Sequence, residues 1–550
     1  MAKKIKKVMI IGLDGASFTV LRPWMDEGLL PNLKRLADDG VTGELQSTIP
    51  PVTGPAWTTF MTGKLPGKHG VYDFVRPDPG GEGMKIVSYD TIASETVFSL
   101  LTRHDKKICA VNLPLTYPVP DVNGYMISGM LTPKSVDDFM KPESLAAELR
   151  DKGINYVQDV WWQRYDESEI EDFLKNLIRC TEERIKTNRY LCGRCNWDFF
   201  VTVFIGTDRI QHCLWEYIFP DQDATAKKKR VTELIKKYYM MVDGFIGEMF
   251  DGLEADTSLL IMSDHGFGPL TGKVFINTLL SELGYLKFDL EALANLKRRG
   301  KGRSGIKKVI KSVDVFKLWG KIGPAVMKKV KRMSAYDFLK CIDWSKTAAY
   351  AASNTEQGIY INLKGRNPGG IVEPEEYDAR RDEVIKVLKG IVHPETGEKM
   401  VSHVFKREEV YEGSCVDSAP DIIFFLKNGE YLSDVQPSES VFEPRSWRTG
   451  SGTHRTEGIL LAYGRDIRSG ESIEGAGIAD ILPTILYLLD IPIPDDLDGK
   501  VLTGIFKDDF SKKKKAVYEK ALDERKGQAV SYSEEEEAEL EERLKGLGYL

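Results

Sequence analysis

VMIIGLDG, residues 8–15, is an apolar run that ends in glycine and aspartate. Similar apolar runs occupy residues 199–205, 258–262 and 458–463. Continuous apolar runs of this length are typical of strands that are buried on both faces of a parallel sheet. Helical stretches such as 31–36 and 484–489 lie between them. The sequence therefore predicts an α/β fold with a doubly wound, mostly parallel sheet.

Length and composition limit the class of protein. The chain has 550 residues, enough for two or three domains or for one large α/β domain with insertions. Hydrophobic residues make up 42%, so a large core can be buried, and the formal net charge is -7. Because the balance is mildly acidic, we expect no general nucleic-acid partner. An anionic substrate would have to be attracted locally, by metals or by a basic patch.

The chain shows no targeting signal. The N-terminal residues lead directly into the apolar run at 8–11, without the longer apolar stretch and cleavage site of a signal peptide. The sequence has no run of about 20 apolar residues, so we expect no transmembrane span. The seven cysteines are odd in number and irregularly spaced, which argues against a disulfide framework. These features predict a cytoplasmic protein.

Composition shifts divide the chain into four segments. We expect the first part of the core at 1–285, a basic helical insert or cap at 286–342, the second part of the core at 343–510, and a separate, charged C-terminal helical tail at 511–550. Between residues 297 and 332 the only acidic residue is Asp314. That basic stretch has three interpretations: a solvated helical face, a lid that steers an anionic substrate, or a peripheral membrane contact. In the tail, Ser533 followed by four glutamates indicates a helix start.

Three aspartates follow the predicted strands. Asp14, Asp208 and Asp264 each lie one to three residues beyond an apolar run. In an open parallel sheet, ligands bind outside the carboxyl ends of the strands, so we expect these side chains to converge at one edge. Carboxylates gathered there would repel each other unless cations neutralised them. This arrangement suggests a metal site.

Three of the seven histidines reinforce that suggestion. His265 directly follows Asp264. His212 lies four residues after Asp208, so on a helix the Asp208 and His212 side chains would face the same way. His454 lies in a Gly-Thr-His loop before the last apolar run. Imidazole and carboxylate together suit zinc, with manganese or iron as alternatives. Six such ligands are sufficient for two ions.

The candidate nucleophile is Thr53, in TIPPVTGPAWTT at residues 48–59. A threonine hydroxyl is a poor nucleophile until its pKa is lowered, and a bound metal can lower it. If Thr53 begins a helix, that N-terminus also offers N–H groups to a phosphate. Gly54 would allow a substrate to approach closely. The alternative is that Thr53 only caps the helix.

These residues together resemble the alkaline phosphatase superfamily, and within it the type I phosphodiesterase and nucleotide pyrophosphatase branch. The matching pieces, in order, are IGLDG at 11–15, TGP at 53–55, TG at 62–63, HG at 69–70, Asp208-x-x-x-His212, SDHG at 263–266 and GTH at 452–454. The resemblance spans residues 8–505. The whole-chain pattern is also similar to a prokaryotic group described as predicted phosphohydrolases or phosphomutases. An alkaline phosphatase-like fold is implied.

The resemblance implies a role for each of these positions. Asp14, Thr53, Asp264 and His265 would hold one divalent ion, and Asp208, His212 and His454 would hold a second ion about 4 Å away. The ions would be zinc, with manganese as the alternative. Thr53 would attack the phosphorus of a small-molecule phosphate ester, of the phosphodiester or nucleotide pyrophosphate type. The resulting phospho-threonine would then be hydrolysed.

One departure from the family pattern leaves the substrate open. Nucleotide pyrophosphatases place an asparagine and a histidine after the proline, where this chain has Ala56 and Trp57. Ala56 cannot donate the hydrogen bond that the asparagine gives to phosphate. Gly54, Trp57 and Arg455 are the candidate substrate contacts. Phosphomonoesterase, phosphomutase and phosphonate hydrolase activities remain alternatives, as does a non-catalytic, metal-stabilised binding module.

Overall fold

A computed structural model describes residues 6–77, 84–160, 167–289, 339–367, 369–446, 450–522, 527, 532–547 and 549. Most of the basic insert predicted at 286–342 lies outside the described residues, so its three interpretations stay predictions. Among the described residues, no helix has the length and hydrophobicity needed to cross a membrane.

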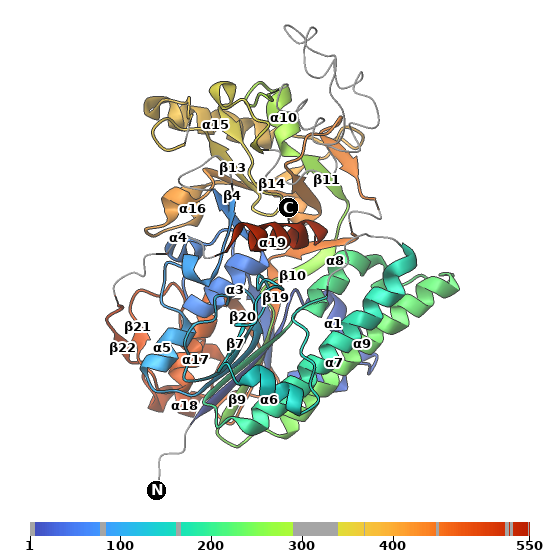
Figure 1. Ribbon diagram of the computed structural model, residues 1–550, viewed down its shortest axis with the longest axis vertical. Helices are drawn as coiled ribbons and strands as arrows, with labels where there is room; N and C mark the ends of the chain where they lie inside the picture. Colours follow the sequence, from blue (N-terminus) through green and yellow to red (C-terminus); the bar gives the residue numbers. More distant parts are fainter. Residues whose placement is uncertain are drawn as a thin grey trace.

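A nine-stranded sheet forms the centre of the molecule (Figure 1). Its order is β20-β2-β19-β9-β1-β8-β5-β6-β7. The strands are β1 (Lys7–Leu13), β2 (Val41–Gln46), β5 (Ile108–Leu113), β6 (Gly124–Ser128), β7 (Met140–Lys141), β8 (Phe199–Phe204), β9 (Thr257–Met262), β19 (Glu457–Tyr463) and β20 (Glu471–Gly477). β1 runs parallel to both of its neighbours, β8 and β9, whereas β19 is antiparallel to β2 and β9. The predicted α/β fold with a mostly parallel sheet is confirmed.

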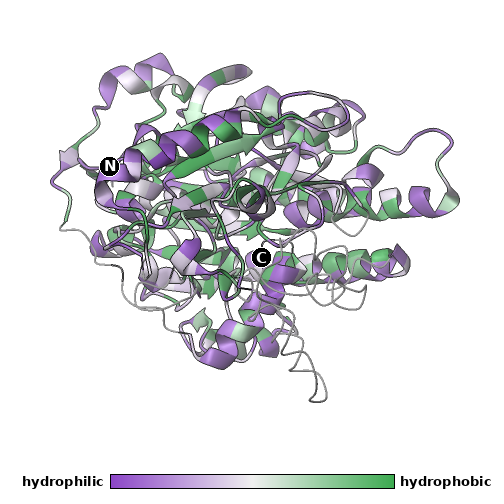
Figure 2. Cartoon of the chain, turned by 90° about the horizontal axis from the view of Figure 1, so that it is seen from above, coloured by the Kyte–Doolittle hydropathy of each residue, from purple (hydrophilic) through white to green (hydrophobic). Residues whose placement is uncertain are grey.

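Both faces of this sheet are covered by helices, which explains the continuous apolar runs. Along β1, Val8 and Ile10 belong to one hydrophobic core, and Met9, Ile11 and Leu13 belong to the other. The first core is covered by α3 (Thr53–Thr62), α5 (Val97–Arg103) and α17 (Ile481–Leu488). The second is covered by α1 (Phe18–Asp26), α2 (Pro31–Asp39), α6 (Leu145–Asp151), α7 (Ile170–Arg194), α8 (Gly206–Ile218) and α9 (Ala226–Asp251). In Figure 2 the central strands are predominantly hydrophobic.

A smaller lobe lies above the carboxyl ends of the large sheet (Figure 1). Its four-stranded sheet has the order β12-β13-β15-β14. The elements of this lobe are β12 (Ala349–Tyr350), β13 (Gly358–Ile361), α15 (Tyr377–Lys389), β14 (Val401–Lys406), α16 (Arg407–Val410) and β15 (Ile422–Leu426). Beside it lie β11 (Gly272–Phe275), α10 (Ile276–Glu282), β16 (Tyr431–Asp434) and β17 (Phe442–Pro444). The segment expected as the second part of the core, 343–510, thus divides between this lobe and the large sheet.

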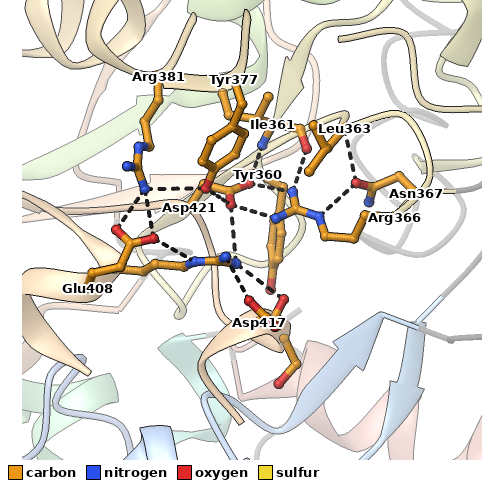
Figure 3. A network of polar contacts seen from close by, with 12 residues as sticks. Tyr360, Ile361, Leu363, Arg366, Asn367, Tyr377, Arg381, Glu408, Asp417 and Asp421 are labelled. Atoms are coloured by element: carbon orange, nitrogen blue, oxygen red, sulfur yellow. Dashed lines mark hydrogen bonds and ion pairs between the residues drawn. The ribbon is translucent and has the colours of Figure 1, made fainter. Parts of the chain in front are cut away.

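A buried carboxylate organises the smaller lobe (Figure 3). Asp421 has no exposed surface and accepts two hydrogen bonds from Arg366, at 2.7 and 2.6 Å. The Tyr377 hydroxyl and the Ile361 N–H also donate to it, at 2.5 and 2.6 Å. Because a buried charge is tolerated only when it is paired and hydrogen-bonded, this network is structural.

A pair of buried carboxylates, Asp73 and Glu356, lies where the lobe meets the core. Asp73 accepts hydrogen bonds from Ser353 and, at 2.7 Å, from Thr355. Glu356 is 2% exposed and accepts the Tyr360 hydroxyl at 2.6 Å. Burial, with a contribution from Asp73, raises the pKa of Glu356 to about 8. Glu356 therefore keeps its proton in the folded protein at neutral pH.

We expect this proton to make stability depend on pH. Between pH 4.5 and 8 the folded chain binds a proton at Glu356 that the unfolded chain releases, so the free energy of unfolding falls as pH rises through this window. In Glu356→Gln the decrease in the free energy of unfolding across this pH window should be smaller than in the parent protein by about 2–4 kcal/mol. Urea unfolding at pH 5 and pH 8.5 measures it, with the exposed Glu375→Gln as the matched control. Equal pH slopes in Glu356→Gln and the parent protein would contradict the assignment.

The C-terminal helix packs against the core and is not a separate tail. Helix α19 (Glu534–Gly546) begins after the predicted cap, where Ser533 accepts a hydrogen bond from the Glu536 N–H. Leu540 and Leu544 are buried in the first hydrophobic core. Figure 1 shows α19 lying across the junction of the core and the smaller lobe. Its many charges concealed this apolar stripe at four-residue spacing.

Candidate functional site

The three predicted aspartates do converge at the carboxyl edge of the large sheet. Asp14 follows β1, Asp264 follows β9, and Asp208 lies in the first turn of α8, after β8. Because β1 lies between β8 and β9, these three strand ends are adjacent. All three side chains are fully buried. Such an arrangement concentrates negative charge where water cannot screen it.

Asp14, Asp264 and His265 form the first group. One ligand atom from each lies within 4.8 Å of the others. His265 Nε2 is 3.3 Å from Asp264 Oδ2 and 3.8 Å from Asp14 Oδ1. Burial is the main cause that raises the pKa of Asp264 to about 8, and Asp208 adds to the effect. Asp264 Oδ2 has no hydrogen-bond partner among the described residues.

Asp208, His212 and His454 form the second group, also within 4.8 Å. Asp208 Oδ1 lies 3.3 Å from His212 Nε2 and 3.4 Å from His454 Nε2, and the two Nε2 atoms are 2.8 Å apart. This oxygen too lacks a hydrogen-bond partner in the described part of the chain. The other oxygen, Oδ2, accepts a hydrogen bond from Arg209 at 2.9 Å. Arg209 therefore fixes the carboxylate and leaves Oδ1 directed at the histidines.

Backbone carbonyls set the tautomers of two histidines. His454 Nδ1 donates to the Pro51 carbonyl at 2.7 Å, and His265 Nδ1 donates to the Gly266 carbonyl at 3.1 Å. A carbonyl can only accept, so each Nε2 carries a lone pair that faces the aspartates. Lone pairs and unpartnered carboxylate oxygens that converge in a buried site need cations to stabilise them. The donor set fits two divalent ions.

The candidate nucleophile lies beside the first group. Thr53 is the first residue of α3 and is 1% exposed. Its Oγ1 is 3.2 Å from His265 Nε2 and 3.5 Å from Asp14 Oδ1. The N-terminal end of a helix has unsatisfied N–H groups and a positive dipole end, both of which favour an anion. An anionic group bound at Thr53 would therefore be stabilised by α3.

The three residues expected to contact the substrate, Gly54, Trp57 and Arg455, lie in different parts of the site and have different partners. Gly54 lies beside Thr53 in the first turn of α3, as expected. The Trp57 indole is fully buried and donates to Asp14 Oδ2 at 2.9 Å, so it orients that carboxylate. The Arg455 guanidinium donates to the carbonyls of Gly429 and Pro269, both at 2.8 Å. The side-chain donors of Trp57 and Arg455 therefore form hydrogen bonds with other groups of the protein.

Sequence reasoning missed two residues of the site. Arg209 pairs with Asp208 and, at 3.0 Å, with the buried Asp159. Its position next to Asp208 was the available signal. The second residue, Tyr549, places its hydroxyl 3.3 Å from Asp208 Oδ2, although 341 residues separate the two in sequence. No local pattern pointed to it.

The sequence model of the type I phosphodiesterase / nucleotide pyrophosphatase family matches residues 8–439, and the chain belongs to that family. The predicted resemblance is thereby confirmed.

Several solved structures are similar to this chain at low sequence identity. Phosphonoacetate hydrolase from Sinorhizobium meliloti 1021 has a TM-score of 0.51 and 15% identity, over 88% of this chain and 95% of that one. Murine ectonucleotide pyrophosphatase / phosphodiesterase 5 has a TM-score of 0.46 and 13% identity, over 91% and 100%. A mutant of alkaline phosphatase PafA has a TM-score of 0.46 and 15% identity, over 92% and 100%. No curated protein sequence matches the chain.

Proposed function

We propose that this protein is a two-metal phosphodiesterase that cleaves small-molecule phosphate esters through a phospho-threonine at Thr53. The observation that carries the proposal is the position of Thr53 Oγ1, 3.2 Å from a histidine lone pair and at the start of a helix. A buried hydroxyl beside the first ligand group, at the start of a helix, is placed to attack an anionic phosphoryl group.

The proposed metal ligands fall into the same two groups that the structure brings together. Asp14, Asp264 and His265, with Thr53, would hold one ion, and Asp208, His212 and His454 would hold the other. Zinc suits this nitrogen and oxygen donor set, with manganese as the alternative. Two bound dications would supply positive charge that balances three aspartates and a threonine alkoxide and would lower the pKa of the Thr53 hydroxyl.

The protein's own residues then position the reaction. The Thr53 hydroxyl gives up its proton as its oxygen attacks phosphorus, and the ester oxygen opposite to it leaves and takes up a proton to become an alcohol. Water later hydrolyses the phospho-threonine, which releases a phosphomonoester and regenerates the hydroxyl. Trp57 and Arg209 hold Asp14 and Asp208 in fixed orientations by their hydrogen bonds. Burial excludes bulk water and strengthens each of these interactions.

A cavity beside the second group favours an uncharged leaving group. It is lined by Pro51, Val52, His212, Asn354, Thr355, Gln357, Leu432, Thr453, His454, Leu547 and Tyr549. Besides the imidazoles of His212 and His454, the lining contains amides, hydroxyls and apolar side chains but no lysine, arginine or carboxylate. A neutral alcohol fits this lining better than a polyphosphate, which would need cations beside it. We therefore favour a phosphate ester over a nucleotide pyrophosphate.

The test compares a chromogenic phosphate diester and the corresponding monoester before and after metal removal. We expect chelation to lower diester hydrolysis by at least about 100-fold and zinc or manganese to restore it. The diester should be the better substrate. A monoester preference would favour a phosphatase or mutase, and cleavage of phosphonates alone would favour a phosphonate hydrolase. Bound metal without any turnover would favour the binding module.

A further inference from the structure

The side chain of Tyr549 enters the site from the C-terminal segment. It is 1% exposed. Its hydroxyl lies 3.3 Å from Asp208 Oδ2 and 3.4 Å from His212 Nε2, and Thr53 is among the groups around it. One oxygen atom thus contacts the second ligand group and lies near the candidate nucleophile. A phosphoryl oxygen on Thr53 would occupy the space next to it.

The segment that carries Tyr549 is a fixed wall of the site. Its ring packs on Phe74, with ring centroids 4.7 Å apart. Leu540 and Leu544 of α19 are buried, and Arg543 donates to the Thr132 carbonyl at 2.6 Å. Undocking this segment would expose three large apolar side chains to water. A permanently docked position suits a residue of the site better than it suits a removable cover.

Two other side-chain donors of the site are already engaged. The Trp57 N–H is used on Asp14, and Arg209 is shared between Asp208 and Asp159. Ala56, in the first turn of α3, has no donor. By contrast, the contacts of the Tyr549 hydroxyl, at 3.3 and 3.4 Å, exceed the usual 2.7–2.8 Å for a hydroxyl donor. A hydroxyl held so weakly can turn to a nearby anion at little cost.

We propose that Tyr549 is a further catalytic residue, whose hydroxyl donates a hydrogen bond to a non-bridging oxygen of the phosphoryl group at Thr53. This inference rests on the proposed function. It assigns the C-terminal helix a role in the site, because α19 is the element that places Tyr549 there. Such a bond would be strongest when negative charge develops on the phosphoryl oxygens.

The experiment uses the full-length, metal-loaded chain with Tyr549→Phe, which removes only the hydroxyl. Tyr518→Phe, at a tyrosine that is 61% exposed, is the matched control. We expect Tyr549→Phe to lower kcat for the diester about 10- to 100-fold, with a smaller change in KM. Binding of inorganic phosphate, measured by calorimetry, should weaken about 5- to 10-fold. Metal content should be unchanged, and Tyr518→Phe should match the parent protein in all three measurements.

Three results would overturn the inference. Unchanged kcat and phosphate affinity would show that the hydroxyl does not contact the phosphoryl group. A rise in kcat, or tighter phosphate binding, would identify Tyr549 as a cover that competes with substrate. Loss of metal would identify it as a ligand. If the parent protein cleaves no ester, the proposed function fails, and the phosphate-binding comparison still decides the role of Tyr549.

Discussion

Thr53→Ala should reduce hydrolysis of the phosphate diester by at least about 10⁴-fold. Thr53 Oγ1 is the hydroxyl that lies within 3.5 Å of both His265 and Asp14, and alanine leaves no oxygen there to attack phosphorus. The substitution removes little volume at a helix start, so we expect folding to be retained. Asp14, Asp264 and His265 remain as ligands of the first ion, so that ion should bind more weakly but still load at excess metal. Steady-state kinetics of the zinc- or manganese-loaded variant, with metal analysis of the same sample, measure the effect.

Thr53→Ser is the matched control, because it keeps the hydroxyl and loses only a methyl group. It should retain activity within about 10-fold of the parent protein. Quenching the parent protein in acid during turnover should trap phosphate on Thr53, and the alanine variant should trap none. Diester cleavage that survives in Thr53→Ala would mean that water attacks phosphorus directly and that no phospho-threonine forms.

Asp208→Asn is expected to remove one of the two metals and to lower activity at least about 10³-fold. Asp208 Oδ1 faces two imidazole nitrogens at 3.3 and 3.4 Å, and an amide in its place lacks the charge that holds a dication. Losing a direct metal ligand should lower activity by more than the ~10- to 100-fold that is usual when a residue hydrogen-bonded to a ligand is substituted. Elemental analysis after dialysis should show about one ion per chain where the parent protein holds two.

Asp434→Asn is the control for this variant. Asp434 is also a buried carboxylate, but it pairs with Lys273 at 2.8 Å, next to the smaller lobe. Its substitution should leave metal content and activity close to those of the parent protein. Two ions retained in Asp208→Asn, with full activity, would exclude Asp208 from the metal site.

The sequence by itself determined the central strands of the sheet and the candidate metal ligands. Buried parallel strands need side chains that are apolar on both faces, so β1, β8 and β9 are recognisable as continuous runs. The aspartates that follow them must share one edge, because the carboxyl ends of neighbouring parallel strands meet there. The spacing of Asp208 and His212 on one helical turn is equally local. These inferences require no knowledge of distant contacts.

Only the tertiary structure decided how the remaining side chains are used. Trp57 and Arg455 carry the chemistry of substrate contacts, yet their donors are directed at Asp14 and at backbone carbonyls. Tyr549 reaches Asp208 only because Leu540 and Leu544 dock α19 on the core. Part of residues 343–510 forms the smaller lobe, where Asp421 accepts hydrogen bonds from Arg366 in a polar network of its own. Each of these outcomes is set by packing between segments far apart in the chain, which residue periodicity does not encode.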